Sequence, residues 1–161
     1  MVKTWFITGT SSGLGRLLAE RLLQRGDRVV ATLRHEGALD ELKQQYDDRL
    51  HVLTLDVTDI REVHTNISAA FEAMGRIDVV VNNAGYGLFG AAEEVTDEQI
   101  ERQLATNLTG SIQVIRAALP HLRARAAAGS FRFRPKVDRS LTRISASITL
   151  RNGASKVSWS R

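Results

Sequence analysis

The stretch TGTSSGLG at residues 8–15 decides how this chain folds. An apolar run, Thr4 to Ile7, precedes it, and a run with leucines at helical spacing, Leu14 to Arg25, follows it. Glycines let a backbone turn sharply and approach a ligand closely, and the start of a helix offers unpaired N–H groups to an anion. The order strand, glycine-rich turn, helix therefore predicts a phosphate-binding turn. The plainer alternative is a turn that only joins a strand to a helix.

Runs typical of strands and helices alternate through the next hundred residues. The expected strands are 4–7, 28–32, 51–55 and 77–81, and the expected helices are 14–25, 39–46, 59–74 and 96–119. Near-continuous apolar strands are typical of a parallel sheet covered on both faces, and right-handed crossovers restrict the strand order. The predicted fold class is therefore α/β: a Rossmann-like, doubly wound parallel sheet of order 3-2-1-4, incomplete at its C-terminal side.

Two helix starts carry capping signals. Asp59 with Glu62 is expected to cap one helix, and Thr96 with Gln99 forms a capping box for the last one. Pro120 is expected to end that last helix. The apolar positions predicted to face the core are Ile60, Val63, Ile67, Phe71 and Met74 in the earlier helix, and Ile100, Leu104, Leu108, Ile112, Ile115 and Leu119 in the later one.

Length and composition narrow the class of protein. A chain of 161 residues is about one domain long. It has no apolar run long enough for a membrane span, no segment typical of a signal peptide and no cysteine, so a cytoplasmic location is expected. The histidines lack metal-ligand spacing, so no metal site is predicted; they are His35, His51, His64 and His121.

The positive charge lies at one end of the chain. Residues 129–161 hold eight Lys or Arg against the single acid Asp138, a net +7, whereas the first 128 residues carry −3 of the overall +4. Apolar periodicity also fades after about residue 125. We therefore divide the chain into a dinucleotide-binding domain at 1–125 and a basic, poorly structured tail at 126–161. Such a tail is also compatible with a nucleic-acid-binding arm.

Four polar features follow the predicted strands. They are the glycine-rich turn, Arg34, Asp56 and the segment that begins at Asn82. Because ligands of parallel α/β sheets bind beyond the carboxyl ends of the strands, these features are expected to share one edge. Their convergence strengthens the prediction of a phosphate-containing ligand.

Together these residues resemble the short-chain dehydrogenase/reductase family over about residues 3–125. TGTSSGLG resembles the family's cofactor loop, Asp56 in LDVTD resembles the acid that holds the adenine amino group, and Asn107 in ATNLTG resembles the catalytic asparagine that fixes a water in a proton relay. The resemblance also implies that the segment at 83–85 in NNAG lies against the cofactor. The cofactor-binding residues it implies are Gly9, Ser11, Ser12, Gly13, Leu14, Gly15, Asp56, Val57, Asn83, Ala84 and Gly85.

Arg34 bears on which dinucleotide would bind. The chain reads Ala31-Thr32-Leu33-Arg34 after the second strand, with no acid for the ribose 2′-hydroxyl. A guanidinium group suits a 2′-phosphate, so NADP(H) is favoured over NAD(H). The alternatives are a solvated surface charge at Arg34, a turn-forming aspartate at Asp56 and a buried structural amide at Asn107.

The acid that the family uses to protonate the alkoxide is missing from the sequence as written. In the family a tyrosine does this, with a lysine four residues later and an aligning serine. Leu50 stands four residues after Tyr46, and Gly90 four residues after Tyr86. Lys156 is preceded at this spacing by Asn152, whose amide cannot serve as the acid.

The tail has the character of a frameshifted product. Joining the last base of each codon to the first two of the next, with permitted codons, converts residues 132–153 into VSSEGGQIAYPNFSLYHATKWG. That string contains a serine pair and Tyr-His-Ala-Thr-Lys at the family's spacing. We therefore predict that residues from about 126 onward are out of frame, and that the chain as written is inactive.

Three functions remain open at this level. The first is an oxidoreductase that transfers hydride between NADP(H) and a small carbonyl or alcohol substrate. The second is a non-catalytic dinucleotide-binding fragment, and the third is a nucleic-acid binder that uses the basic tail. The tail lacks zinc, helix-turn-helix or aromatic-stacking patterns, which disfavours nucleic acid as a partner. The resemblance leaves the substrate open and makes a homo-oligomer possible.

Overall fold

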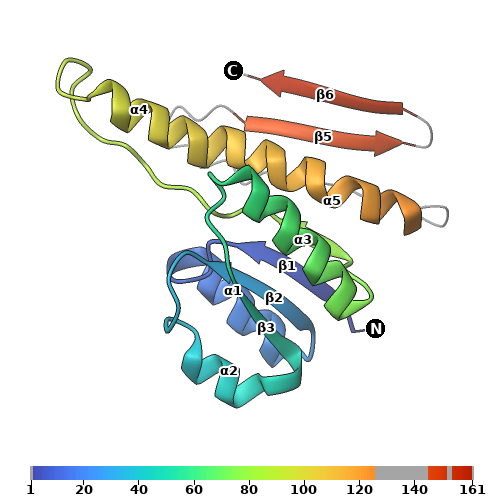
Figure 1. Ribbon diagram of the computed structural model, residues 1–161. Coiled ribbons are helices and arrows are strands. Elements are labelled where there is room, and N and C mark those ends of the chain that lie inside the picture. The colour runs from blue at the N-terminus through green and yellow to red at the C-terminus, as the bar shows by residue number, and fades with distance from the viewer. Residues whose placement is uncertain (1, 126–144, 152–153, 161) are drawn as a thin grey trace.

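The computed structural model describes residues 2–125, 145–151 and 154–160 (Figure 1). The first hundred residues or so alternate strands with helices, as predicted. The elements in order are β1 (Thr4–Thr8), α1 (Gly13–Gln24), β2 (Arg28–Leu33), α2 (Asp40–Tyr46), the 3₁₀ turn η1 (Asp47–Arg49), β3 (Leu50–Thr54), α3 (Ile60–Met74), β4 (Val79–Val81), α4 (Asp97–Leu104), the π-helical stretch η2 (Ala105–Gly110), α5 (Ser111–Arg125), β5 (Ser145–Arg151) and β6 (Ala154–Ser160).

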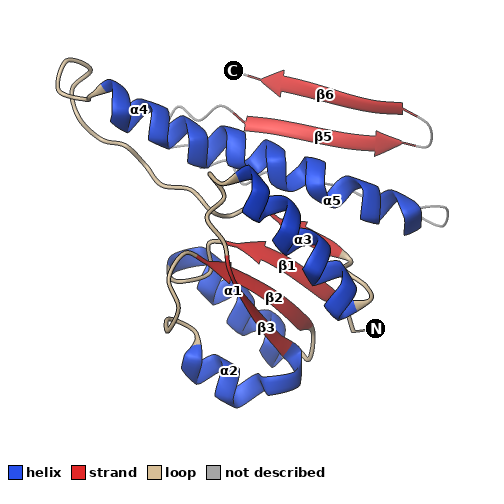
Figure 2. Cartoon of the chain, in the orientation of Figure 1, coloured by secondary structure: helices blue, strands red, loops and turns tan. Residues whose placement is uncertain are grey.

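Four of the strands form one parallel sheet of order β3-β2-β1-β4, which confirms the predicted topology. Trp5 in the central strand β1 pairs with Val29 of β2 on one side and with Val79 of β4 on the other. All these strands run the same way, so their carboxyl ends, and the loops that follow them, lie along one edge of the sheet (Figure 2).

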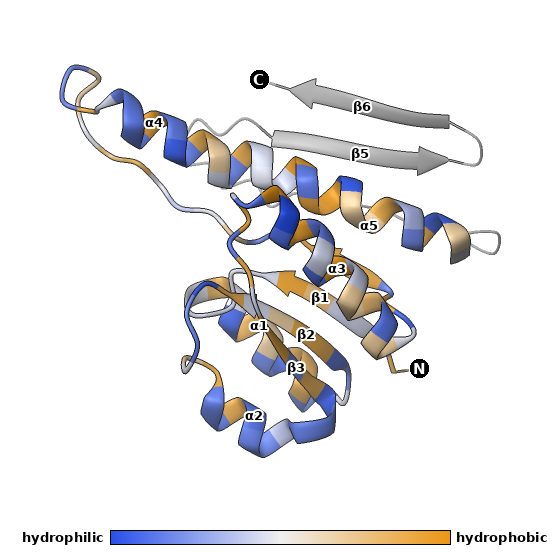
Figure 3. Ribbon diagram, in the orientation of Figure 1, coloured by the Kyte–Doolittle hydropathy of each residue, from blue (hydrophilic) through white to orange (hydrophobic). Residues whose placement is uncertain are grey.

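Alternate residues of each strand supply two separate cores. Phe6 and Val30 face the layer that includes α3 and α5, whereas Ile7 and Val29 face the layer that includes α1 and α2. Strands buried on both faces read as continuous apolar runs, which is why β1 and β2 appear strongly hydrophobic in Figure 3. The sheet with helices on both sides is the doubly wound α/β fold that the sequence predicts.

The last long helix differs from the prediction at its C-terminal end. It continues through Pro120 to Arg125, whereas Pro120 was expected to end it. A proline removes one backbone hydrogen bond, and here Ala118 and Leu122, buried on either side of it, hold the helix against α3. The capping box of Thr96 and Gln99 is confirmed.

The predicted apolar faces were partly wrong. Ile60, Ile100 and Leu104 are exposed by 46%, 40% and 44% respectively, although they continue the helical spacing. Ile100 and Leu104 belong to α4, which extends beyond the layer that covers the sheet (Figure 1). In α5 the predicted position Ile115 is buried, and Val114, Ala117, Ala118 and Leu122 are buried with it.

Of the predicted capping pair, Asp59 caps the helix and Glu62 does not. The Asp59 carboxylate accepts hydrogen bonds from the backbone N–H groups of Arg61 and Glu62, at 2.8 and 3.1 Å. The Glu62 carboxylate instead accepts the backbone N–H of Asp56 at 3.0 Å. Glu62 therefore supports the loop after β3.

Strands β5 and β6 pair with each other in a separate antiparallel sheet, in which Ser145 lies opposite Ser160. They do not extend the four-stranded sheet. The rest of the predicted tail, 126–144 in particular, lies outside the described residues, so its assignment as out of frame stays a prediction. Within the described chain, no helix is both long and apolar enough to cross a bilayer.

Candidate functional site

The turn between β1 and α1 depends on its glycines. Gly9 and Gly13 have φ values of +69° and +58°, in the left-handed region that favours glycine. A Cβ added to Gly9 would lie 2.7 Å from the Cα of Ala84, so the turn also approaches the chain after β4 more closely than a side chain allows. Two loops that are far apart in sequence thus meet backbone to backbone.

Asn83 and Thr8 lock these two loops together. The Asn83 side-chain amide donates to the backbone oxygens of Thr8 and Gly9, at 3.0 and 2.8 Å. In return the Thr8 hydroxyl oxygen accepts the backbone N–H groups of Asn83 and Ala84, both at 3.0 Å. Thr8 is only 1% exposed, so these bonds are shielded from water. They join the carboxyl ends of β1 and β4 and leave the glycine turn little freedom.

The start of α1 has the character of an anion site. Its N-cap residue Ser12 makes no side-chain capping bond, and the first turn carries no acid, so within the described residues neither of these groups occupies its first N–H groups. The residues from 11 to 14 are exposed, whereas Gly15 is buried. Unpaired N–H groups and the positive end of the helix dipole favour a phosphate here.

Asp56 lies beyond the end of β3, with its carboxylate partly occupied. One oxygen accepts the Thr58 backbone N–H at 2.9 Å and the Thr58 hydroxyl at 2.8 Å. Partial burial alone would raise the pKa of Asp56, but the Thr58 hydrogen bonds and the charges of Arg34 and Arg102 outweigh it, so its pKa is lowered. Asp56 is therefore ionised at neutral pH and can accept a hydrogen bond from a ligand amino group.

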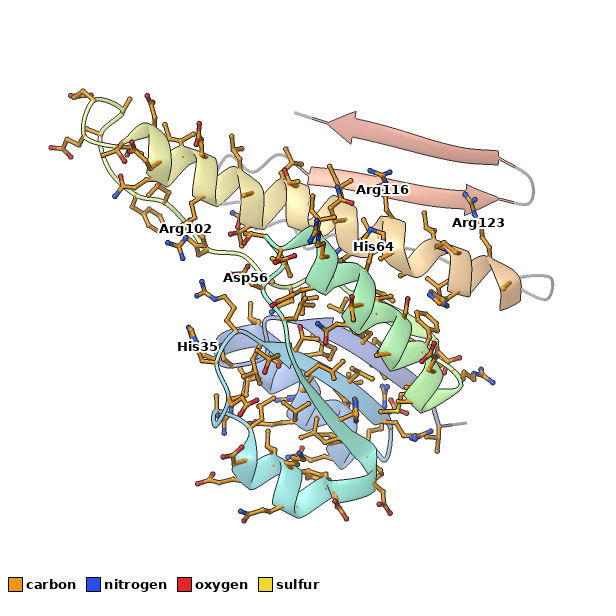
Figure 4. The ribbon with its side chains drawn as sticks, viewed as in Figure 1. His35, Asp56, His64, Arg102, Arg116 and Arg123 are labelled. Carbon is orange, nitrogen blue, oxygen red and sulfur yellow. The ribbon has the colours of Figure 1, made fainter. Side chains whose placement is uncertain are left out.

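The neighbouring Val57 is buried and fixes this loop against the last helix. A Cβ on Gly110 would lie 2.8 Å from the Val57 backbone oxygen, so only glycine permits the approach. Arg34 lies exposed one residue past the end of β2. Figure 4 shows Asp56 at this edge, in the same region of the molecule as Arg102.

Asn107 lies in the π-helical stretch and holds the loop after β4. Its Oδ1 accepts the backbone N–H of Tyr86 at 3.0 Å, and its Nδ2 donates to the backbone oxygen of Tyr86 at 2.8 Å. Gly85 passes so close that an added Cβ would lie 3.0 Å from the same Oδ1. Local π-helix is frequent at functional sites, and here it aims the Asn107 amide at the loop. The water-relay role implied by the resemblance stays a prediction.

We expect Asn107→Ala to lower the free energy of unfolding by about 1–2 kcal/mol, because the Tyr86 N–H loses its partner and the Tyr86 backbone oxygen keeps only the 3.4 Å bond from the Gln103 amide. Urea unfolding followed by circular dichroism measures this change. Asn66→Ala is the matched control, since Asn66 makes a single bond to the Glu62 backbone within its own helix. Equal losses in the two variants would contradict the conclusion that the Asn107 side chain holds the loop after β4.

The structure thus gathers most of the predicted site residues at one edge. Direct contacts join the glycine turn to 83–84, Val57 to Gly110, and Gly85 to Asn107. Ser11, Ser12, Gly13 and Leu14 line the exposed start of α1. The sequence analysis did not predict that the Thr8 hydroxyl joins the two loops, although a polar residue at the end of an apolar strand could have indicated such a role. Among the described residues no group of His, Asp or Glu could hold a metal ion.

A dinucleotide fits these residues. The uncapped helix start and the glycine turn suit a pyrophosphate, and the ionised Asp56 suits an adenine amino group. A family model described as short chain dehydrogenase matches residues 3–130. The chain belongs to this family. The residues that carry the resemblance all lie within the matched segment.

Curated relatives and solved structures agree with the family. Oxidoreductase BOA17 of Botryotinia fuckeliana is 43% identical over 124 residues, which cover 76% of this chain and 45% of the relative. A short-chain dehydrogenase from Streptomyces avermitilis superposes with a TM-score of 0.75 at 39% identity, over 78% of this chain and 46% of that one. The structure of ElxO with NADP bound superposes with a TM-score of 0.72 at 29% identity, over 78% of this chain and 52% of that one. The chain spans about half the length of the relatives it matches.

Proposed function

We propose that this chain is the NADP(H)-binding half of a short-chain dehydrogenase/reductase that transfers hydride between the cofactor and a small carbonyl or alcohol. The observation that carries the proposal is the lock between Asn83 and the Thr8–Gly9 backbone, which holds an uncapped helix start beside the chain after β4. A rigid turn with free N–H groups is what a pyrophosphate requires.

The preference for NADP(H) rests on Arg34. It is the first residue past β2, it is exposed, and no acid precedes it in that strand to accept the ribose 2′-hydroxyl. Guanidinium and phosphate form charge-assisted hydrogen bonds, often bidentate. ElxO is described as NADP-bound, and YdfG of Escherichia coli, 33% identical over 115 residues, is named an NADP-dependent 3-hydroxy acid dehydrogenase.

The bound cofactor supplies the hydride, and the chain's own residues bind and orient it. Reduction of a carbonyl also needs a proton donor whose pKa suits the alkoxide. Tyr86 has its backbone held by Asn107, but Gly90 stands where a pKa-lowering lysine is needed. The proposal is therefore that this chain binds cofactor without turnover, and that the parent enzyme carries its serine, tyrosine and lysine in the other reading frame.

The reading-frame proposal has a direct support in the sequence. Trp159 has one codon, whose last base must supply a leading G to the next codon in the alternative frame, yet the shifted string keeps the family pattern. The cytoplasm is the proposed location, since the sequence contains no cysteine. A homo-oligomer is compatible with the family but has no specific support in the described residues.

We expect the 161-residue chain to bind NADPH about tenfold more tightly than NADH and to show no NADPH oxidation with a panel of aldehydes and ketones. Fluorescence titration of each cofactor and absorbance at the nicotinamide band measure the two parts. A gene corrected to the other frame after codon 125 is expected to restore turnover. Equal affinity for both cofactors would contradict the proposed preference for NADP(H). Turnover by the uncorrected chain would contradict the proposal that it lacks the catalytic proton donor.

A further inference from the structure

Glu62 departs from the capping role that its position in the sequence predicts. It is the third residue of α3 after the N-cap Asp59, the place from which a glutamate ordinarily bonds back to the N-cap backbone. Here the Asp59 carboxylate accepts the N–H groups of Arg61 and Glu62, and the Glu62 carboxylate reaches past the N-cap to the Asp56 backbone N–H at 3.0 Å. The Glu62 carboxylate therefore serves the loop after β3 and not the helix that carries it.

This contact completes a series of hydrogen bonds through the loop after β3. On one side of Asp56, the Leu55 N–H donates to the Leu33 backbone oxygen of β2 at 2.9 Å. On the other side, the Asp56 backbone oxygen accepts the Asp59 N–H at 3.1 Å. Glu62 holds the N–H of Asp56 itself, from outside the loop. It therefore sets the direction of the peptide group between Leu55 and Asp56, on which the place of the Asp56 side chain depends.

Two polar groups of this loop are left to a ligand. Within the described residues, the hydrogen bonds that the Asp56 carboxylate accepts both come from Thr58 and go to Oδ1, which leaves Oδ2 as an acceptor. In the same described part of the chain, the Val57 N–H donates to no other group, unlike the N–H groups of Asp56 and Thr58. An acceptor beside a donor matches the edge of adenine, where the amino group lies beside the ring nitrogen N1. A 6-oxopurine such as hypoxanthine reverses both positions.

We propose that Glu62 is a positioning residue for base recognition, which holds Asp56 and Val57 so that the loop distinguishes adenine from a 6-oxopurine. Hydrogen bonds weaken steeply as their alignment is lost, so a side chain that fixes the backbone beside the acceptor also fixes the selectivity. This inference rests on the proposed binding of a dinucleotide, with Asp56 as its adenine contact. Glu62 lies outside the LDVTD segment at 55–59 that carries the resemblance to the family.

The test compares NADPH with its analogue in which hypoxanthine replaces adenine. Fluorescence titration of the full chain measures the ratio of the two affinities. We expect the wild type to prefer NADPH about twentyfold, Asp56→Ala to remove most of this preference and Glu62→Ala to lower it about fivefold. Glu62→Gln keeps an oxygen that can accept the Asp56 N–H, so it should retain most of the preference. Glu72→Ala, at an exposed position of the same helix, is the matched control and should change nothing.

The outcomes separate the two proposals. If the wild type binds neither ligand, the proposed dinucleotide site is wrong, and this inference with it. Binding of both ligands with equal affinity leaves the dinucleotide site in place and overturns this inference alone. An equal loss for both ligands in Glu62→Ala also overturns it, because it would show that Glu62 only stabilises the start of α3, a contribution that urea unfolding measures. A lower ratio in Glu62→Ala that Glu62→Gln recovers supports the inference.

Discussion

Gly15→Ala is expected to destabilise the protein by about 3 kcal/mol and to abolish cofactor binding. Gly15 lies in the first turn of α1, where alanine would ordinarily stabilise the helix by about 1 kcal/mol. Here an added Cβ would overlap the Gly9 backbone oxygen and the Asn83 amide nitrogen. The clash opposes the helix propensity and separates the two loops that form the site. Urea unfolding and NADPH titration measure the two effects.

Gly13→Ala is the matched control in the same turn. A Cβ on Gly13 meets nothing within 4 Å, but its φ of +58° is strained for alanine. We therefore expect a loss of only about 1 kcal/mol from backbone strain. If Gly13→Ala destabilised the chain as much as Gly15→Ala, the close approach at Gly15 would not distinguish the two positions, and the lock between the loops would lose its support.

The second large effect is expected for Asp27→Asn, at the opposite edge of the sheet. The Asp27 carboxylate is buried and accepts the Lys3 backbone N–H at 3.0 Å, the Trp5 indole N–H at 3.1 Å and the Arg25 guanidinium. An amide cannot accept all of these, so the free energy of unfolding should fall by about 2 kcal/mol. Thermal or urea unfolding at neutral pH measures it.

The same residue makes stability depend on pH. Burial would raise the pKa of Asp27, but the Arg25, Lys3 and Trp5 hydrogen bonds lower it below its ordinary value. A carboxylate with a lowered folded pKa stabilises the fold above its ordinary pKa of about 4, and this contribution is lost as the pH falls through the folded value. The difference in stability between wild type and Asp27→Asn should therefore shrink below pH 4. Asp48→Asn, at an exposed position, is the control and should show no such trend.

Most of the fold could be predicted because its strands are buried on both faces. The runs at Thr4–Thr8 and Arg28–Leu33 are apolar without interruption, and the strand order follows from right-handed crossovers between them. Helix ends were less predictable. Pro120 lies inside a helix since core contacts on both sides outweigh one missing hydrogen bond, and those contacts are not visible in the spacing.

The site was predictable in its residues but not in its connections. The glycine turn, Asp56 and the segment at 83–85 were identified because each follows a strand, and parallel strands end at a common edge. That Asn83 bonds the Thr8 and Gly9 backbone, or that Asn107 clamps Tyr86, depends on side-chain directions set by packing. The spacing of Glu62 from Asp59 predicts a helix cap, and only the folded loop shows that Glu62 bonds Asp56 instead.

The sequence by itself determined the parallel α/β sheet, the glycine-rich turn after its first strand and the lack of a tyrosine–lysine pair at the family's spacing, because apolar periodicity, glycine spacing and residue identity are properties of the chain alone. The tertiary structure decided which polar groups share one site. It brings Asn83 to Gly9 and places Gly110 against Val57, contacts that span 74 and 53 positions along the chain. Only burial of both faces of the sheet brings such distant residues within hydrogen-bonding distance.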